Sequence, residues 1–361
     1  MMKKFIFFTK TDWNEPPRLR HQLARLLVSY KHKIIFFEKP TTFLFGKKIK
    51  LSKENGITFI RSKQLIHRLL RIFKMLTYLN TLFELRVLKN RVKNIKILKE
   101  DIIVNFNYDY YFLRSLFPEN YIVTIINDDF WCRALFGYEK PLKDVLDLTC
   151  KMSDSVLAVS YPLVEQLSVY CNPQLLLPWS DLKYKRPNME VKKYRLLFWG
   201  YINNRLNFDY IIKLANALKE SDLDIVIEFI GPEERKIDLR YIELKKHPNI
   251  RTEGPTDIQN LNFDTVLGAF IPYVDGNKAD DATTIPNKAF PMLANGLPLL
   301  ITGMPHFIDE PFVFRLGEDL TQDIQLILTM NKKLPSLQTY IEKFVNTNTS
   351  DKRYQEFMST I

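Results

Sequence analysis

The sequence lacks any apolar run long enough to cross a bilayer, and it is poor in cysteine. No stretch of the 361 residues approaches the ~20 apolar residues that a membrane-spanning helix needs. The three cysteines, Cys132, Cys150 and Cys171, are odd in number and lack the spacing of metal ligands, so we expect free thiols. The start, MMKKFIFFTKTDW, has no long apolar region and no small-residue cleavage site, and it is expected to form a strand rather than a signal peptide. These absences predict a cytoplasmic protein.

The positive charge is concentrated in the first part of the chain. The net charge is +11, yet residues 1–100 hold 24 Lys and Arg against 6 Asp and Glu, a net +18, which leaves −7 for the remainder. Such asymmetry suggests an anionic partner on that side, namely a membrane surface, a phosphate-bearing acceptor or a nucleic acid. No nucleic-acid module signature and no zinc pattern supports the last of these, so we expect no nucleic-acid partner.

One stretch, residues 285–300 (IPNKAFPMLANGLPLL), has the pattern of a loop, a short helix and a strand. Pro286 stands where a helix tolerates proline, and Gly296 and Pro298 end the helix. Free backbone N–H groups would therefore gather beside four polar side chains: Thr283, Thr284, Asn287 and Lys288. This arrangement predicts an anion site, most plausibly for phosphate. The alternative is an ordinary amphipathic helix packed on a sheet.

The same stretch resembles the donor-nucleotide signature of group 1 (family four) glycosyltransferases. In that signature a proline-lysine segment leads into a helix that ends Ala-x-Gly-x-Pro before a buried strand. The matching residues are Pro286, Lys288, Phe290, Leu293, Ala294, Gly296 and Pro298. The family usually carries two glutamates eight positions apart, near the donor sugar and on the ribose, and here Thr283 and Pro291 stand in their places. Asp280 or Asp281 could replace the first of them.

A second phosphate-binding turn is expected after the strand at residues 195–200. There Gly200 enters the loop YINNRLN, so the backbone can come close to a diphosphate and Arg205 can meet it. Asn203 and Asn204 are possible helpers. The resemblance extends to Gly231 and Pro232, which end the next strand.

The first part of the chain opens with a strand, a helix and a strand, at residues 4–9, 18–30 and 33–38. It resembles the start of transferases that assemble cell-surface polysaccharides, in the residues Asp12, Trp13, Pro17, Arg18, Gln22 and Ala24. Arg18, Arg20 and His21 could meet an acceptor or a donor phosphate, or could simply be solvated. Asp128 and Asp129 follow another predicted strand, at residues 121–126, and are candidates for contacting the acceptor hydroxyl. Their alternative role is to cap a helix.

Residues 61–99 are basic and helix-prone. An apolar stripe is predicted at Leu65, Leu69, Ile72, Phe73, Leu76 and Leu79. We expect a helix pair whose stripe packs in the core and whose basic rim, Arg68, Arg71 and Lys74, touches an anionic membrane.

The resemblance spans nearly the whole chain, with its motifs in the family's order. It implies an α/β protein with the GT-B fold, in which two Rossmann-like domains with doubly wound parallel sheets face a cleft. The expected parts are an acceptor-binding domain at residues 1–185, a nucleotide-sugar domain at 186–340, and a C-terminal helix at 341–361 that crosses back.

The implied activity is transfer of a sugar from a nucleotide-diphosphate sugar to a glycan or lipid-linked acceptor of a bacterial surface glycan. The family implies retention of anomeric configuration, no obligatory metal and no cofactor besides the donor substrate. With the basic charge of the first domain, a cytoplasmic protein that can associate with the inner face of the cytoplasmic membrane is expected. The residues implied to act on the reacting groups are Asp128, Asp129, Arg205 and Lys288. Two alternatives stay open, a GT-B nucleotide-sugar epimerase and a degenerate transferase that serves as a binding subunit.

Overall fold

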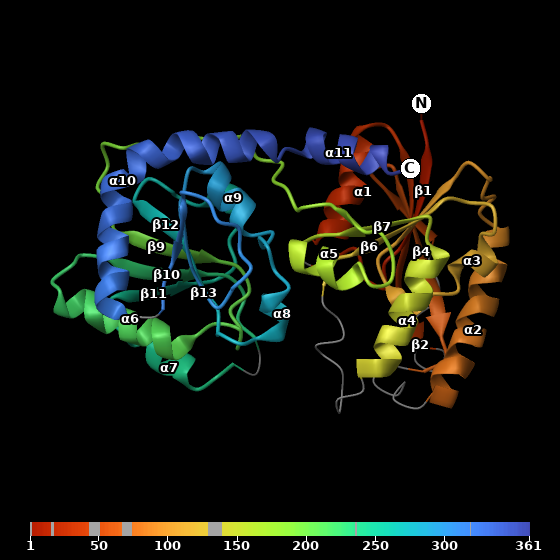
Figure 1. Cartoon of the computed structure of the whole chain (residues 1–361), viewed down its shortest axis with the longest axis horizontal. Coiled ribbons are helices and arrows are strands. Elements are labelled where there is room, and N and C mark those ends of the chain that lie inside the picture. The colour runs from red at the N-terminus through yellow and green to blue at the C-terminus, as the bar shows by residue number, and fades with distance from the viewer. Residues whose placement is uncertain are drawn as a thin grey trace. The chain divides into compact units, whose positions relative to one another are not determined.

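The computed structural model describes residues 2–15, 18–42, 51–66, 74–128, 139–234, 237–317 and 319–361. The chain divides into two compact units, residues 1–177 with 354–361, and residues 178–353 (Figure 1). The sequence predicts the change of domain at residues 185/186, and the structure makes it at 177/178. The last helix, α11 (Ser350–Ser359), begins in the second unit and ends in the first.

The first unit is built on an eight-stranded sheet with the order β3-β4-β2-β1-β5-β6-β7-β8. All its described pairs are parallel except β3 with β4. The strands are β1 (Lys4–Phe8), β2 (Lys33–Thr42), β3 (Leu51–Glu54), β4 (Ile57–Gln64), β5 (Ile102–Asn105), β6 (Ile122–Ile126), β7 (Ser155–Ala158) and β8 (Gln174–Leu175). The helices are α1 (Leu19–Ser29), α2 (Lys74–Lys93), α3 (Leu113–Leu116), α4 (Glu139–Met152) and α5 (Tyr161–Leu167), with a 3-10 turn at Tyr108–Tyr110.

Aromatic side chains fill the core of the first unit. Phe5, Phe7 and Phe8 of β1 are fully buried, on both faces of the sheet. The ring of Phe8 stacks on that of Phe37 with 4.5 Å between centroids. Strands covered on both faces read as continuous apolar runs rather than as an alternation, which explains the sequence KFIFF of β1.

The second unit has a six-stranded sheet, all parallel, with the order β11-β10-β9-β12-β13-β14. The strands are β9 (Arg195–Trp199), β10 (Val226–Ile230), β11 (Ile250–Glu253), β12 (Val266–Pro272), β13 (Leu299–Thr302) and β14 (Val313–Arg315). The helices are α6 (Phe208–Glu220), α7 (Arg240–Leu244), α8 (Lys278–Asp281), α9 (Ala289–Ala294) and α10 (Leu320–Thr347), with a 3-10 turn at Ile258–Asn260. This is the strand order of dinucleotide-binding sheets, and its direction of winding reverses between β9 and β12.

The predicted α/β architecture with two doubly wound parallel sheets is confirmed. In such sheets ligands bind outside the carboxyl ends of the strands, at the point where the strand order reverses. In the second unit that point is where β9 passes into Gly200 and β12 passes into Tyr273. The fold therefore directs attention to the loops after these two strands.

The prediction of a helix pair over residues 61–99 is wrong at both ends. Residues 61–64 end strand β4, because Arg61 pairs with Glu38 of β2 in the parallel ladder and their side chains form an ion pair of 3.0 Å. Helix α2 ends at Lys93. Leu79 of the predicted core stripe is 39% exposed, whereas Leu69, Ile72 and Phe73 lie outside the described residues. In the part of the chain that the structure describes, no helix combines the length and apolarity needed to cross a bilayer.

Candidate functional site: the carboxyl edge of the second sheet

Two glycines bring the backbones of neighbouring loops together at this edge. Gly200 follows β9 with φ +146°, and Gly231 follows β10 with φ +155°. A Cβ atom on Gly231 would lie 1.9 Å from the carbonyl oxygen of Gly200, so no side chain fits there. The Gly200 N–H donates to Ile230 O at 3.0 Å, which locks the two turns together. The result is a backbone ledge without side chains, as close approach to a diphosphate requires.

Lys288 extends from the start of α9 to this ledge. Its ammonium lies 4.1 Å from the centroid of the Phe198 ring and 5.2 Å from that of Tyr273. A Cβ atom on Gly200 would be only 3.0 Å from Lys288 Nζ, so the ammonium lies directly over the glycine. No carboxylate of a described residue lies within ion-pair distance of Nζ. Lys288 therefore presents a positive charge beside the ledge, steadied by two aromatic faces.

Arg205 supplies a second cation, held by a buried carboxylate. Its Nη2 donates to Asp280 Oδ1, and its Nε donates to Asp280 Oδ2 at 3.3 Å. The Asp280 side chain is fully buried, whereas that of Arg205 is 37% exposed. The Arg205 guanidinium carbon lies 4.7 Å from the Tyr273 ring centroid, so both cations border the same ring. Burial raises the pKa of Asp280, while its bond with Arg205 and the charge of Lys288 act in the opposite direction.

Asp280 does not replace the missing family glutamate. Its carboxylate is bound to Arg205 and has no exposed surface, so a donor sugar could not reach it in this structure. The carboxylate instead fixes the direction of the guanidinium. The backbone supports the same alignment, because Val274 N–H donates to Arg205 O at 2.9 Å and joins the loops after β9 and β12.

Three of the other predicted donor-site residues shape the loops at this edge. Asn203 Oδ1 accepts from Arg205 N–H at 3.1 Å, and Asn204 Oδ1 accepts from Asp238 N–H at 2.9 Å, so both shape loops. Pro232 O accepts from Ile202 N–H at 2.9 Å. Thr284 is 1% exposed, Thr283 is half-buried, and Asn287 is exposed. Of the predicted set, the structure gathers Gly200, Gly231, Arg205 and Lys288.

Helix α9 contributes less than the sequence suggested. It spans six residues, Ala289–Ala294, and Lys288 is its N-cap residue with helical φ and ψ. So short a helix has a weak dipole, and the anion-binding capacity of this edge comes from side-chain cations and the glycine ledge. The sequence did not predict that the rings of Phe198 and Tyr273 contact the two cations. An aromatic residue at the end of a strand is usually part of the core, so its type and position do not indicate a cation–π contact.

In the first unit, the loop after β1 and the start of α1 hold three basic side chains. Arg20 is 5% exposed; its Nη1 donates to Thr9 O at 3.0 Å and to Thr11 Oγ1 at 2.5 Å. Burial, and then the charge of Arg18, lower the pKa of Arg20 to about 10, against the opposing charges of Glu15 and Asp128. Asp128 thus lies within electrostatic reach of Arg20 at the carboxyl end of β6. Asp129, the other predicted acceptor residue, lies outside the described residues.

His21 is occupied by the structure of this loop. Its Nδ1 accepts from Arg18 N–H at 3.0 Å, and its Nε2 lies 3.3 Å from Asp12 O. Because Nδ1 is an acceptor, Nε2 carries the proton and donates to Asp12 O. Burial lowers the pKa of His21, which favours this neutral form. His21 therefore caps α1 and orders the Asp12 turn.

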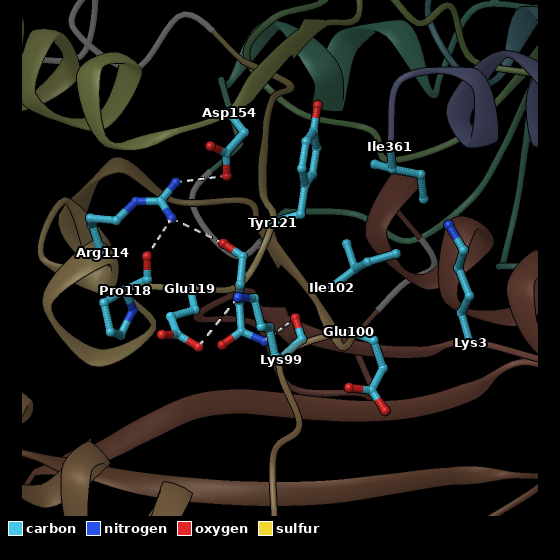
Figure 2. Close-up of a pocket in the computed structure, with 11 residues that line it drawn as sticks. Lys3, Lys99, Glu100, Ile102, Arg114, Pro118, Glu119, Tyr121, Asp154 and Ile361 are labelled. Atoms are coloured by element: carbon cyan, nitrogen blue, oxygen red, sulfur yellow. Dashed lines mark hydrogen bonds and ion pairs between the residues drawn. The ribbon is translucent and has the colours of Figure 1, made fainter.

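A shallow hollow of about 610 Å³ lies at the opposite, amino edge of the first sheet (Figure 2). It is lined by Lys3, Lys99, Glu100, Ile102, Arg114, Pro118, Glu119, Asn120, Tyr121, Asp154 and Ile361. Arg114 donates to the carbonyl oxygen of Asn120 and forms a 2.7 Å ion pair with Asp154 (Figure 2). It also donates to the carbonyl oxygen of Met152. The arginine is thus used to tie loops together, and the hollow has no carboxyl-edge loops around it. We assign it no chemistry.

Comparison with solved structures identifies the fold. A sucrose-phosphate synthase from Thermosynechococcus elongatus matches with a TM-score of 0.71 and 12% identity, over 99% of this chain and 98% of that chain. A trehalose-6-phosphate structure from E. coli bound with UDP-2-fluoro glucose matches with a TM-score of 0.68 and 11% identity, over 99% and 98%. The pneumococcal O-GlcNAc transferase GtfA, in complex with UDP and GlcNAc, matches with a TM-score of 0.61 and 10% identity, over 99% and 98%.

The chain has the GT-B fold, and the matches extend over 99% of its length. No protein-family model and no curated protein matches its sequence. At identities of 10–12% the likeness establishes the fold alone, so substrate and reaction are argued from the residues.

Proposed function

We propose that the protein is a glycosyltransferase whose second unit binds a nucleotide-diphosphate sugar. The observation that carries the proposal is the pair of cations, Lys288 and Arg205, beside the Gly200–Gly231 ledge at the reversal point of a GT-B sheet. A diphosphate laid on the ledge could approach the backbone closely, because no side chain stands there, and it would meet two positive charges. Phosphate oxygens prefer such surroundings.

The same two cations would serve the reaction. Negative charge builds on the oxygen of the leaving diphosphate as the glycosidic bond breaks, and cations already in place stabilise that charge without reorganisation. The proposed mechanism therefore needs no metal ion for this step. In front-face transfer with retention, the leaving phosphate itself can take the proton of the acceptor hydroxyl. Such a mechanism tolerates Thr283 and Pro291 at the positions of the family glutamates.

The acceptor is assigned to the first unit. Asp128, at the carboxyl end of β6 and within electrostatic reach of Arg20, is the candidate for hydrogen bonding to the acceptor hydroxyl, with Asp129 beside it in the sequence. Arg18, whose side chain is 54% exposed, favours an acceptor that carries negative charge, such as a sugar linked to a lipid phosphate, and the buried Arg20 adds positive charge behind it. This agrees with the proposed role in surface-glycan synthesis at the inner face of the cytoplasmic membrane.

A second candidate is a binding subunit without transferase activity. The observation that favours it is the loss of both family glutamates, together with the burial of Asp280, which leaves only the partly exposed Asp281 of the two carboxylates that could replace the first glutamate. A nucleotide-sugar epimerase would need the same donor site and no acceptor, and the basic first unit has no role in that reaction.

Calorimetric titration with UDP, GDP, dTDP and CMP, and with their sugars, tests the donor site. We expect one nucleotide series to bind, and Lys288→Ala or Arg205→Ala to weaken binding about tenfold to a hundredfold, because each removes a charge-assisted hydrogen bond. Lys333→Ala, an exposed lysine on α10, is the matched control and should bind like the parent. Unchanged affinity in both site variants would overturn the assignment. Binding without transfer to any phosphorylated or lipid-linked acceptor would favour the binding-subunit candidate.

A further inference from the structure

Helix α2 turns an unusual face away from the first unit. Its outward apolar side chains are Met75, Tyr78, Leu79 and Leu82, which are 74%, 60%, 39% and 43% exposed. The exposed basic residues Arg86, Lys89 and Lys93 continue the same face toward the end of the helix. Spacings of three, four and seven residues place these side chains on one side of a helix. We call this set of seven residues the α2 outer face.

Buried polar contacts fix which way α2 faces. On its inner side Asn80 Oδ1 accepts from the Leu65 N–H at 2.9 Å, Glu84 forms a 3.3 Å ion pair with Lys10, and Leu88 is 1% exposed. These three residues recur every fourth position, opposite the α2 outer face. The exposure of the outer face therefore follows from the packing of the helix, which runs along the side of the first unit (Figure 1).

The charge on the α2 outer face is entirely positive. Glu84 is the only acidic residue in α2, and it points inward to Lys10. Arg86, Lys89 and Lys93 make no ion pair with any described residue. The four apolar side chains span about 10 Å along the axis, and the three basic ones span a further 10 Å or so, from a rise of about 1.5 Å per residue. A partner must thus offer apolar contact beside negative charge.

We propose that the α2 outer face docks the first unit on an anionic phospholipid bilayer. Acyl chains would receive Met75, Leu79 and Leu82, Tyr78 would lie at the level of the headgroups, and lipid phosphates would meet the basic residues. A bilayer is the fitting partner because it offers acyl chains directly beside phosphates, which matches the apolar and the basic halves of the α2 outer face. Its positive charge continues that of residues 1–100, which carry a net +18. The inference does not depend on the transfer reaction.

Vesicle co-sedimentation tests this docking. The probes are vesicles of phosphatidylcholine alone and of phosphatidylcholine with phosphatidylglycerol, each at low and at raised salt. We expect the parent protein to bind the anionic vesicles preferentially. The variant with Arg86→Gln, Lys89→Gln and Lys93→Gln should lose at least about tenfold in partition, since each basic residue near the surface contributes about fivefold. Leu79→Asn with Leu82→Asn should weaken binding at both salt concentrations, because apolar contact is not screened.

Two matched controls lie in the second unit. Lys332→Gln with Lys333→Gln and Lys343→Gln removes the same three charges from exposed positions of α10. Leu239→Asn with Ile242→Asn removes two exposed apolar side chains, which are 77% and 50% exposed. Both controls should bind as the parent does, and circular dichroism should show all variants folded.

Three results would overturn the proposal: equal binding of the parent to neutral and anionic vesicles, equal losses in the controls, or vesicle binding unchanged by the α2 substitutions. The last result would leave the α2 outer face to a protein partner. A parent that is dimeric, with α2 variants that are monomeric and still bind vesicles, would assign the face to a second copy of the chain.

Discussion

Replacing Gly231 by alanine should destabilise the fold, whereas replacing the neighbouring Gly200 should mainly weaken donor binding. A methyl group on Gly231 would lie 1.9 Å from the carbonyl oxygen of Gly200, where ordinary contact begins at about 3.4 Å. The opposing atom is backbone, tied to β10 by the 3.0 Å bond from Gly200 N–H to Ile230 O, so the overlap of about 1.5 Å cannot be relieved by a rotamer change. Overpacking of about 1–3 kcal/mol and strain of about 1–3 kcal/mol act together. We expect Gly231→Ala to lose about 3 kcal/mol or more of unfolding free energy.

Gly200→Ala should instead fold and lose donor affinity. Its added methyl group would meet Lys288 Nζ at 3.0 Å and Cε at 3.3 Å, the flexible end of a side chain. The lysine can yield by a few tenths of an ångström, so stability falls mainly by the strain of φ +146°, about 1–3 kcal/mol. The methyl group would displace the Lys288 ammonium and keep a diphosphate from the backbone. Binding of a nucleoside diphosphate should therefore weaken about tenfold, the cost of losing one charged hydrogen bond.

Alanine variants of two other glycines distinguish the cost of backbone strain from the cost of a steric clash. Gly276 has φ +70° with nothing within 4 Å of an added Cβ, and Gly254 has open space with no positive φ. Urea denaturation should therefore order the alanine variants Gly254, Gly276, Gly200 and Gly231 by increasing loss, with Gly254→Ala close to neutral. Nucleotide titration should single out Gly200→Ala among the variants that fold. A Gly231→Ala protein no less stable than Gly276→Ala would refute the collision, and with it the description of the ledge.

Three further predictions concern other buried groups. Burial holds the pKa of Asp280 in the folded protein above its value in the unfolded chain. The folded protein therefore loses stability as pH rises above the unfolded pKa, because the buried carboxyl group must then ionise. Asp280→Asn has no such group, so its stability relative to the parent in urea denaturation should increase from about pH 4 to about pH 7. Tyr210→Phe removes the 2.8 Å hydrogen bond to the buried carboxylate of Asp323 and should cost about 1–3 kcal/mol by the same assay. A hydrogen bond with Cys150 lowers the pKa of Cys171, so mass spectrometry should find Cys171 alkylated before Cys150; the reverse order would contradict that pairing.

The elements that the sequence predicts well are those set by local apolar pattern. The strand predicted at residues 4–9 is β1 (Lys4–Phe8), and the helix predicted at 18–30 is α1 (Leu19–Ser29). A few consecutive residues are enough to predict a parallel strand buried on both faces or an amphipathic helix, because each has its own apolar pattern. The co-linear motifs then led to the GT-B fold, which the solved structures confirm.

Elements whose structure depends on contacts with residues far away in the sequence could not be predicted from the local pattern. The segment Arg61–Gln64 has no strand-like pattern of its own; it is a strand because Arg61 pairs with Glu38 and also reaches Asp12 at 2.8 Å. Helix α2 has two half-apolar sides, and which of them is buried depends on Asn80 and Glu84 finding partners in Leu65 and Lys10. Sequence periodicity alone chose the wrong side for Leu79.

The candidate site shows the same division. Gly200, Arg205 and Lys288 could be picked out because glycine and cations after strands suit a phosphate. The role of Asp280 could not, because a carboxylate near a site can bind ligand or hold another side chain, and only burial decides between them.

The burial of Asp280 also bears on how the proposed reaction would work. Two cations border the ledge, and the buried carboxylate of Asp280 fixes the direction of one of them, Arg205. With Thr283 and Pro291 at the glutamate positions, the described residues near the ledge offer the diphosphate far more than they offer the sugar or the ribose. We therefore expect a nucleoside diphosphate to bind about as tightly as its sugar conjugate. Selection of the sugar would then fall to the step in which the acceptor binds, and a donor sugar that raises affinity more than about tenfold over the bare diphosphate would contradict this division of roles.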